Sequence, residues 1–202
     1  MKEILKKDWP FAILILVLIV LSIISVGNLK YGFFTAYDEA YFLLKMQEAY
    51  DMSCVTGKSQ WNLLAAHWFP YLDLTSVIQS RLASSILIWT TVIFSTLTCC
   101  MVFDKRKVIK YFALIFLVYF TTGGVMSYTG GVMSYNPMRI AVANWALCAF
   151  VLFYYSEISW KKYIWAGLCG LFLGLLCFVV IPAALAILAC VAVLICIQYC
   201  PK

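Results

Sequence analysis

Long apolar runs alternate along the chain with short polar interruptions. The runs cover residues 11–27, 82–103, 108–126, 140–155, 163–180 and 183–200. A helix needs about 20 apolar residues to cross the hydrocarbon core of a membrane, and most of these runs approach that length. Ile181–Pro182 divides the last long run into two, because proline breaks a helix. The pattern predicts an all-α, polytopic transmembrane helical protein of about six spans, with residues 1–202 in a single membrane domain.

The polar stretch of residues 28–81 separates the first two runs and is expected to form juxtamembrane helices. Helical patterns cover residues 37–52 and 60–68, and a third pattern runs from Asp73 into the second span. On a helical wheel, the first pattern has an apolar arc, formed by Phe42, Leu43, Met46 and Tyr50. A helix of this kind can lie in the plane of the membrane interface.

Composition and charge support a membrane protein and orient it. Of the 202 residues, 65% are hydrophobic and only 12% are charged, against roughly 25% charged in an average soluble domain. The net charge of +6 lies in short clusters beside the apolar runs, with no basic face for nucleic acid. Six spans with a cytoplasmic N-terminus place the clusters at residues 2–7, 105–110, 161–162 and 202 inside, as the positive-inside rule requires. The prediction is an N-in/C-in topology in which loop 28–81 faces outward.

The chain begins like a signal peptide, with a basic N-terminus followed by an apolar run. The run is too long for a signal sequence and no small-residue cleavage site follows it, so we interpret it as a retained anchor.

Residues 123–129 are repeated almost unchanged as residues 130–136, which is typical of a local duplication in a tolerant outer connection.

Other residues that often carry chemistry have simpler interpretations here. Seven of the nine cysteines lie within apolar runs, where a thiol behaves as a small hydrophobe. His67 is the only histidine and is expected at the membrane interface, and no metal-binding cluster is present. Gly167, Gly170 and Gly174 have the small-residue spacing that favours close packing with the sixth span or a partner protein.

Asp38 and Glu39 are the strongest candidates for chemistry. One interpretation is structural, because carboxylates in the first turn of a helix interact favourably with its dipole. The other interpretation is catalytic and depends on a family resemblance. A basic N-terminus, one span and then Tyr37-Asp38-Glu39-Ala40-Tyr41-Phe42-Leu43 on an outer helix resembles the GT-C glycosyltransferases. Within that superfamily, the lipid A aminoarabinose transferases and the protein O-mannosyltransferases are the most similar.

The resemblance extends over roughly residues 1–140. His67-Trp68-Phe69-Pro70-Tyr71 and Gln79-Ser80-Arg81-Leu82 are similar to the second outer helix of that family, which leads into the second span with an arginine. Asn136-Pro137-Met138-Arg139 is a looser match to the outer end of a later span.

The resemblance implies a sugar donor linked to polyprenyl phosphate and a lipid or glycan acceptor, at the outer face of a bacterial cytoplasmic membrane. It assigns Asp38 as the general base and Glu39 as its support. It assigns substrate binding, with charge neutralisation at the donor phosphate, to Lys58, His67, Arg81 and Arg139. A divalent cation is the one cofactor that the resemblance leaves open.

Two alternatives remain at this point. Members of the family are usually longer, so the first alternative is that the chain is the N-terminal part of a split or truncated enzyme. The second alternative is a scaffold without catalysis, which would be a binding subunit of a cell-envelope polysaccharide pathway, with a partner membrane subunit. The spans contain few ionisable groups, which argues against a solute transporter.

Overall fold

The computed structural model describes residues 2–28, 38–50, 61–121 and 135–199. Every regular element in these residues is helical, which confirms the all-α class. The elements are α1 (Lys2–Asn28), α2 (Asp38–Tyr50), α3 (Trp61–Trp68), α4 (Val77–Val102), the 3₁₀ turn η2 (Lys105–Lys107), α5 (Val108–Thr121), α6 (Tyr135–Tyr155), α7 (Ser159–Val179) and α8 (Ile181–Tyr199).

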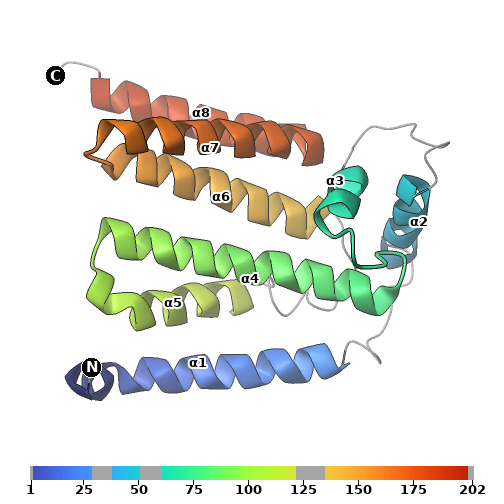
Figure 1. Ribbon diagram of the computed structural model, residues 1–202, viewed down its shortest axis with the longest axis horizontal. Helices are drawn as coiled ribbons and strands as arrows, with labels where there is room; N and C mark the ends of the chain where they lie inside the picture. Colours follow the sequence, from blue (N-terminus) through green and yellow to red (C-terminus); the bar gives the residue numbers. More distant parts are fainter. Residues whose placement is uncertain (1, 29–37, 51–60, 122–134, 200–202) are drawn as a thin grey trace.

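The long helices lie side by side, and two short helices cover one end of the bundle (Figure 1). Contacts between neighbours give the spatial order α1, α5, α4, α6, α7, α8. α1 therefore packs mainly against α5, and Leu18 of α1 also joins an apolar cluster that contains Ile88 and Val92 of α4. α2 and α3 lie at the end where α4 and α6 begin, and η2 and the α6–α7 connection lie at the opposite end.

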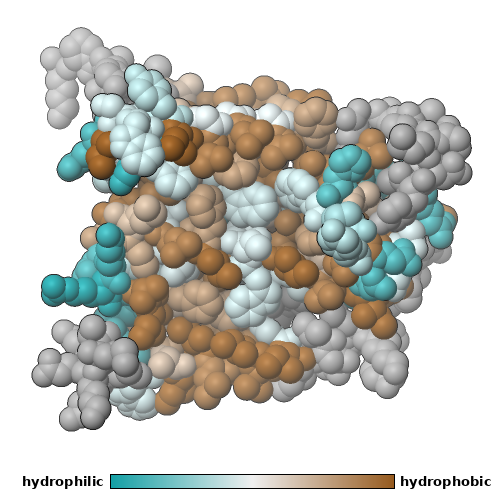
Figure 2. Space-filling view, viewed as in Figure 1, coloured by the Kyte–Doolittle hydropathy of each residue, from teal (hydrophilic) through white to brown (hydrophobic). Residues whose placement is uncertain are grey.

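Three helices are long and apolar enough to cross a membrane within the described residues: Val77–Val102, Asn136–Tyr155 and Ser159–Val179. The apolar parts of α1 and α8, Asp8–Ile23 and Ile181–Val193, are shorter. Figure 2 shows that hydrophobic residues cover much of the side of the bundle, while hydrophilic residues gather at its two ends. The predicted class of transmembrane helical protein is supported to this extent.

The predicted apolar runs coincide with helices, although the helix ends differ. α1 begins at Lys2, nine residues before the predicted run at Phe11, and contains Pro10. Its first turns are tilted from the rest of the helix (Figure 1), as expected where proline removes a backbone donor. Residues 122–126 of the predicted third span and the tandem repeat up to residue 134 lie outside the described residues.

The predicted break near Ile181–Pro182 occurs at Val180. This residue has an extended backbone, with φ −154° and ψ 102°, between the end of α7 and the start of α8. Its carbonyl oxygen accepts hydrogen bonds from the amides of Ala183 and Ala184, at 3.2 and 3.3 Å. Pro182 lies in the first turn of α8, where its missing N–H leaves no internal hydrogen bond unmade.

Two local expectations differ from the structure. Gly167, Gly170 and Gly174 do not pack closely against α8, because a Cβ atom added at any of them would meet nothing within 4 Å, and their packing against a partner protein stays a prediction. Helix α4 begins at Val77 and not at Asp73. The Asp73 carboxylate instead accepts hydrogen bonds from the Thr75 amide at 3.0 Å and the Thr75 hydroxyl at 2.6 Å, which stabilises a turn before the helix.

A polar contact joins α4 and α6 inside the bundle. The Ser95 hydroxyl of α4 lies 2.8 Å from Asn144 Oδ1 of α6, and also 2.8 Å from the carbonyl oxygen of Thr91. The Cys148 thiol approaches the same amide oxygen at 3.4 Å. A hydrogen bond between helices in such surroundings fixes their relative rotation, because a polar group without a partner is costly there.

This contact predicts a measurable coupling between Ser95 and Asn144. In a double-mutant cycle with Ser95→Ala and Asn144→Ala, the coupling in the free energy of unfolding should be about 0.6 kcal/mol, with an upper bound of about 1.7 kcal/mol. Thr96→Val with Asn144→Ala is the matched control, because the Thr96 hydroxyl bonds only to Val92 of its own helix, at 2.8 Å. Equal coupling in both cycles would contradict a specific Ser95–Asn144 bond.

Candidate functional site

The candidate site lies at the α2–α3 end of the bundle. Asp38 and Glu39 form the first turn of α2, and this position agrees with the helix predicted from residue 37. Their side chains lie outside the described part of the structure, so the arrangement of the two carboxyl groups stays a prediction. Lys58 also lies outside the described residues.

The apolar arc predicted for α2 packs against α3. Met46 is fully buried, and Phe42 joins the same cluster, with its ring centroid 5.7 Å from that of Trp61. The Asn62 side-chain amide of α3 donates a hydrogen bond to the carbonyl oxygen of Lys45, at 2.9 Å. These contacts fix α2 to α3 and thereby fix the backbone that carries Asp38 and Glu39.

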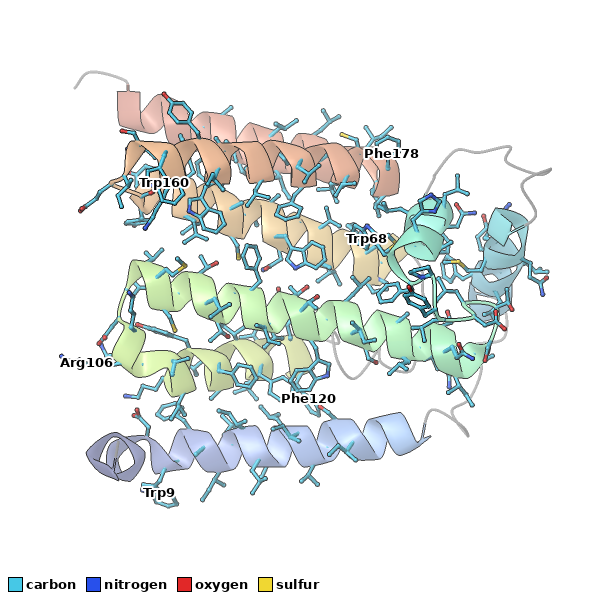
Figure 3. The ribbon with its side chains drawn as sticks, in the orientation of Figure 1. Trp9, Trp68, Arg106, Phe120, Trp160 and Phe178 are labelled. Atoms are coloured by element: carbon cyan, nitrogen blue, oxygen red, sulfur yellow. The ribbon has the colours of Figure 1, made fainter. Side chains whose placement is uncertain are left out.

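The α2–α3 pair is fixed to the bundle by the same apolar cluster. Leu74 from the turn before α4 and Ala83 and Leu87 from α4 belong to it, together with Met138 from α6. Trp68 at the end of α3 packs against Trp145 of α6, with ring centroids 5.7 Å apart. Figure 3 shows Trp68 at this end, with Arg106 and Trp160 at the opposite end. The short helices therefore rest on the ends of α4 and α6 as a packed layer.

Arg81 is buried in the second turn of α4, with 1% of its surface exposed. A guanidinium keeps its positive charge when buried, so it brings a fixed cation to this end of the bundle. Ser80 and Ser84 on the same part of α4 are also buried. The sequence predicted Arg81 as a phosphate-binding residue but did not predict that it would be enclosed.

The remaining predicted site residues lie at the same end but differ in exposure. His67 is exposed on α3, in accord with an interfacial side chain, and Arg139 is half-buried in the first two turns of α6. The structure thus gathers α2, α3 and the starts of α4 and α6, which carry Asp38, His67, Arg81 and Arg139, at one end of the bundle (Figure 1).

A row of polar residues along α4 was missed by the sequence analysis. Ser84, Thr91 and Ser95 are all buried, and they continue the buried polar face that begins at Ser80 and Arg81. The row could have been predicted from the sequence, because serine and threonine recur in α4 at the three- and four-residue spacing that places side chains on one helix face. Thr91 and Ser95 bond back to carbonyl oxygens four residues earlier, which satisfies their hydroxyl groups within the helix.

Asp73 is the carboxylate at this end whose environment the structure describes. The hydrogen bond from the Thr75 hydroxyl lowers the pKa of Asp73 below its ordinary value of 3.8, and the Thr75 amide acts in the same direction. The ionised form of Asp73 therefore stabilises the α3–α4 turn. Among the described residues, no group of three or more His, Cys, Asp or Glu side chains is arranged to hold a metal ion.

No protein-family model, curated protein or solved structure matches this chain.

The Asp73 turn gives a prediction on pH dependence. Because the pKa of Asp73 is lower in the folded protein, its stabilising effect is present above the ordinary value and is lost as the pH falls through the lowered value. Thr75→Val should move the pKa of Asp73 upward, which an NMR titration of the Asp73 carboxyl carbon in micelles would measure. Ser76→Ala is the control, because Ser76 contributes its amide and not its hydroxyl to Asp73. An unchanged pKa in Thr75→Val would contradict the assigned cause.

Proposed function

We propose that this chain is a GT-C-type glycosyltransferase, or the N-terminal part of one. It would transfer a sugar from a polyprenyl-phosphate donor to a lipid or glycan acceptor on the outer face of a bacterial cytoplasmic membrane. The observation that carries the proposal is the packing of α2 and α3 onto the end of the bundle opposite η2. This packing holds the helix that begins with Asp38 and Glu39 beside the membrane-facing helices.

The proposed topology has six spans, with both termini in the cytoplasm. It is supported by the distribution of described basic residues, since Lys105, Arg106 and Lys107 of η2 lie at the same end as Lys161 and Lys162 of α7. Basic residues favour the cytoplasmic side of a membrane. The α2–α3 end would then face outward, where a lipid-linked donor and its acceptor meet.

The proposed reaction needs few functional groups. A hydroxyl of the acceptor attacks the anomeric carbon of the sugar, and the bond from that carbon to the phosphate oxygen of the donor breaks. Asp38 would accept the proton of the attacking hydroxyl, and Glu39 would support it. The polyprenyl phosphate leaves with the bonding electron pair, so cations beside it stabilise the developing negative charge. Arg81 and Arg139 are the described candidates, with Lys58 and His67 as further contributors in the proposal.

The burial of Arg81 bears directly on this role. A buried guanidinium interacts with an anion more strongly than an exposed one, because fewer water molecules screen it. The 1% exposure of Arg81 means that a donor phosphate would reach it only if the groups that cover this side chain move when the donor binds.

The test replaces Asp38 by Asn in membranes supplied with a polyprenyl-phosphate-linked sugar. General-base catalysis contributes about 10²–10⁴-fold, so transfer should fall by at least about a hundredfold. Asp73→Asn is the matched control at the same end, because asparagine retains the side-chain oxygen that accepts from Thr75. Undiminished transfer by Asp38→Asn would remove Asp38 as the base. An unsubstituted protein that transfers no sugar would favour the non-catalytic subunit instead.

A further inference from the structure

A cavity lies at the end of the bundle away from α2 and α3. It has a volume of about 480 Å³ and is lined by the ends of α4 and α6, the adjoining η2, the α6–α7 connection and the start of α7. Its walls combine charged, aromatic and apolar side chains, including Val102, Lys105, Tyr155, Glu157, Lys161 and Trp165. Such a mixture is typical of a site for a molecule that is polar at one end and apolar at the other.

The charged groups of this cavity have no ion-pair partner in the described part of the chain. The two lysines, Lys105 and Lys161, face a single carboxylate, Glu157, so the cavity carries a net positive charge. In contrast, Lys107 pairs with Asp104 at 3.6 Å and Lys110 pairs with Asp8 at 3.9 Å. Figure 2 shows hydrophilic surface at this end both on the η2 side and on the α6–α7 side. Lys105 and Lys161 are therefore available to an anion.

Aromatic residues border the same cavity. Tyr155 is exposed at the end of α6, and Trp165 is half-buried one turn beyond Lys161. The Lys161 ammonium lies 5.7 Å from the centroid of the Trp160 ring, which Figure 3 shows at this end of the bundle. Tryptophan and tyrosine gather where lipid headgroups meet the hydrocarbon layer. Their positions indicate that the cavity lies at headgroup depth.

An apolar groove begins beside this cavity. It has a volume of about 450 Å³ and lies between α4, α5 and α6, with Leu114, Val118 and Leu147 among its lining residues. Val102 lines both spaces, so the basic cavity and the groove adjoin at the end of α4. The groove is almost entirely apolar and is suited to an acyl chain.

We propose that the two spaces together bind one anionic phospholipid. Its phosphate would lie between Lys105 and Lys161, and one of its acyl chains would lie in the groove beyond Val102. Basic pockets between membrane helices on the cytoplasmic side attract anionic headgroups in this way. Glu157 disfavours a second negative charge close to the phosphate and so selects a singly charged headgroup such as phosphatidylglycerol. This site is separate from the proposed transferase site and does not depend on it.

The test measures phosphatidylglycerol bound to the full-length protein in detergent by native mass spectrometry. Lys105→Ala with Lys161→Ala is compared with Lys107→Ala with Lys162→Ala. Both pairs remove two positive charges from the same two segments, but only the first pair removes cavity residues. A charge-specific site predicts that the first pair binds about tenfold more weakly than the second. The charge-preserving pair, Lys105→Arg with Lys161→Arg, should bind like the unsubstituted protein, which separates lost binding from lost folding.

Three results would overturn the proposal. Equal weakening by the two alanine pairs would mean diffuse attraction to the surface. Equal binding of phosphatidylethanolamine and phosphatidylglycerol would mean that the cavity does not distinguish an anionic headgroup from a zwitterionic one. Complete displacement of the lipid by inorganic phosphate at equal concentration would mean that the groove contributes nothing. Retention of phosphatidylglycerol in the presence of phosphate supports a lipid as the occupant.

Discussion

The exposed apolar sides of the long helices determine where polar groups can lie in this protein. Leu16 on α1, Leu171 on α7 and Leu185 on α8 are each more than half exposed, as are many other large apolar residues. Hydrocarbon tolerates such a surface only if every backbone polar group is satisfied within the chain, and helices meet that condition. In the long helices that the structure describes, charged groups therefore lie near the helix ends. The two ends of the bundle become the places where polar chemistry is available.

The two ends differ in how they are built. At one end α2 and α3 form a packed layer over the starts of α4 and α6, anchored by Met46, Trp61 and Trp68. At the other end the helices are joined by short basic connections around Lys105 and Lys161. A folded layer can position a catalytic group, whereas short basic connections suit orientation and contact with lipid headgroups. This division supports a transferase site at the first end and a lipid site at the second.

The sequence predicted the features that depend on neighbouring residues. Hydropathy located the long helices, and the helical wheel located the arc of α2 that contains Phe42 and Met46. The sequence prediction was wrong about the start of α4 at Asp73, because the hydrogen bonds from Thr75 to the Asp73 carboxylate favour a turn over the expected helix. It also could not predict the burial of Arg81 or the bond between Ser95 and Asn144, since both depend on helices that lie far apart in the chain. The arrangement and the catalytic role of the Asp38 and Glu39 carboxyl groups stay a prediction from the sequence and its family resemblance.

We propose that the α2–α3 end and the η2 end face opposite sides of a membrane. It is tested most directly by labelling single cysteines in intact cells with a membrane-impermeant maleimide, after replacement of the nine native cysteines. Lys58→Cys reports on the connection between α2 and α3, and Arg106→Cys reports on η2. We expect labelling at position 58 in intact cells and labelling at position 106 only after the membrane is permeabilised. Labelling of both positions from the same side, or the reverse pattern, would contradict it.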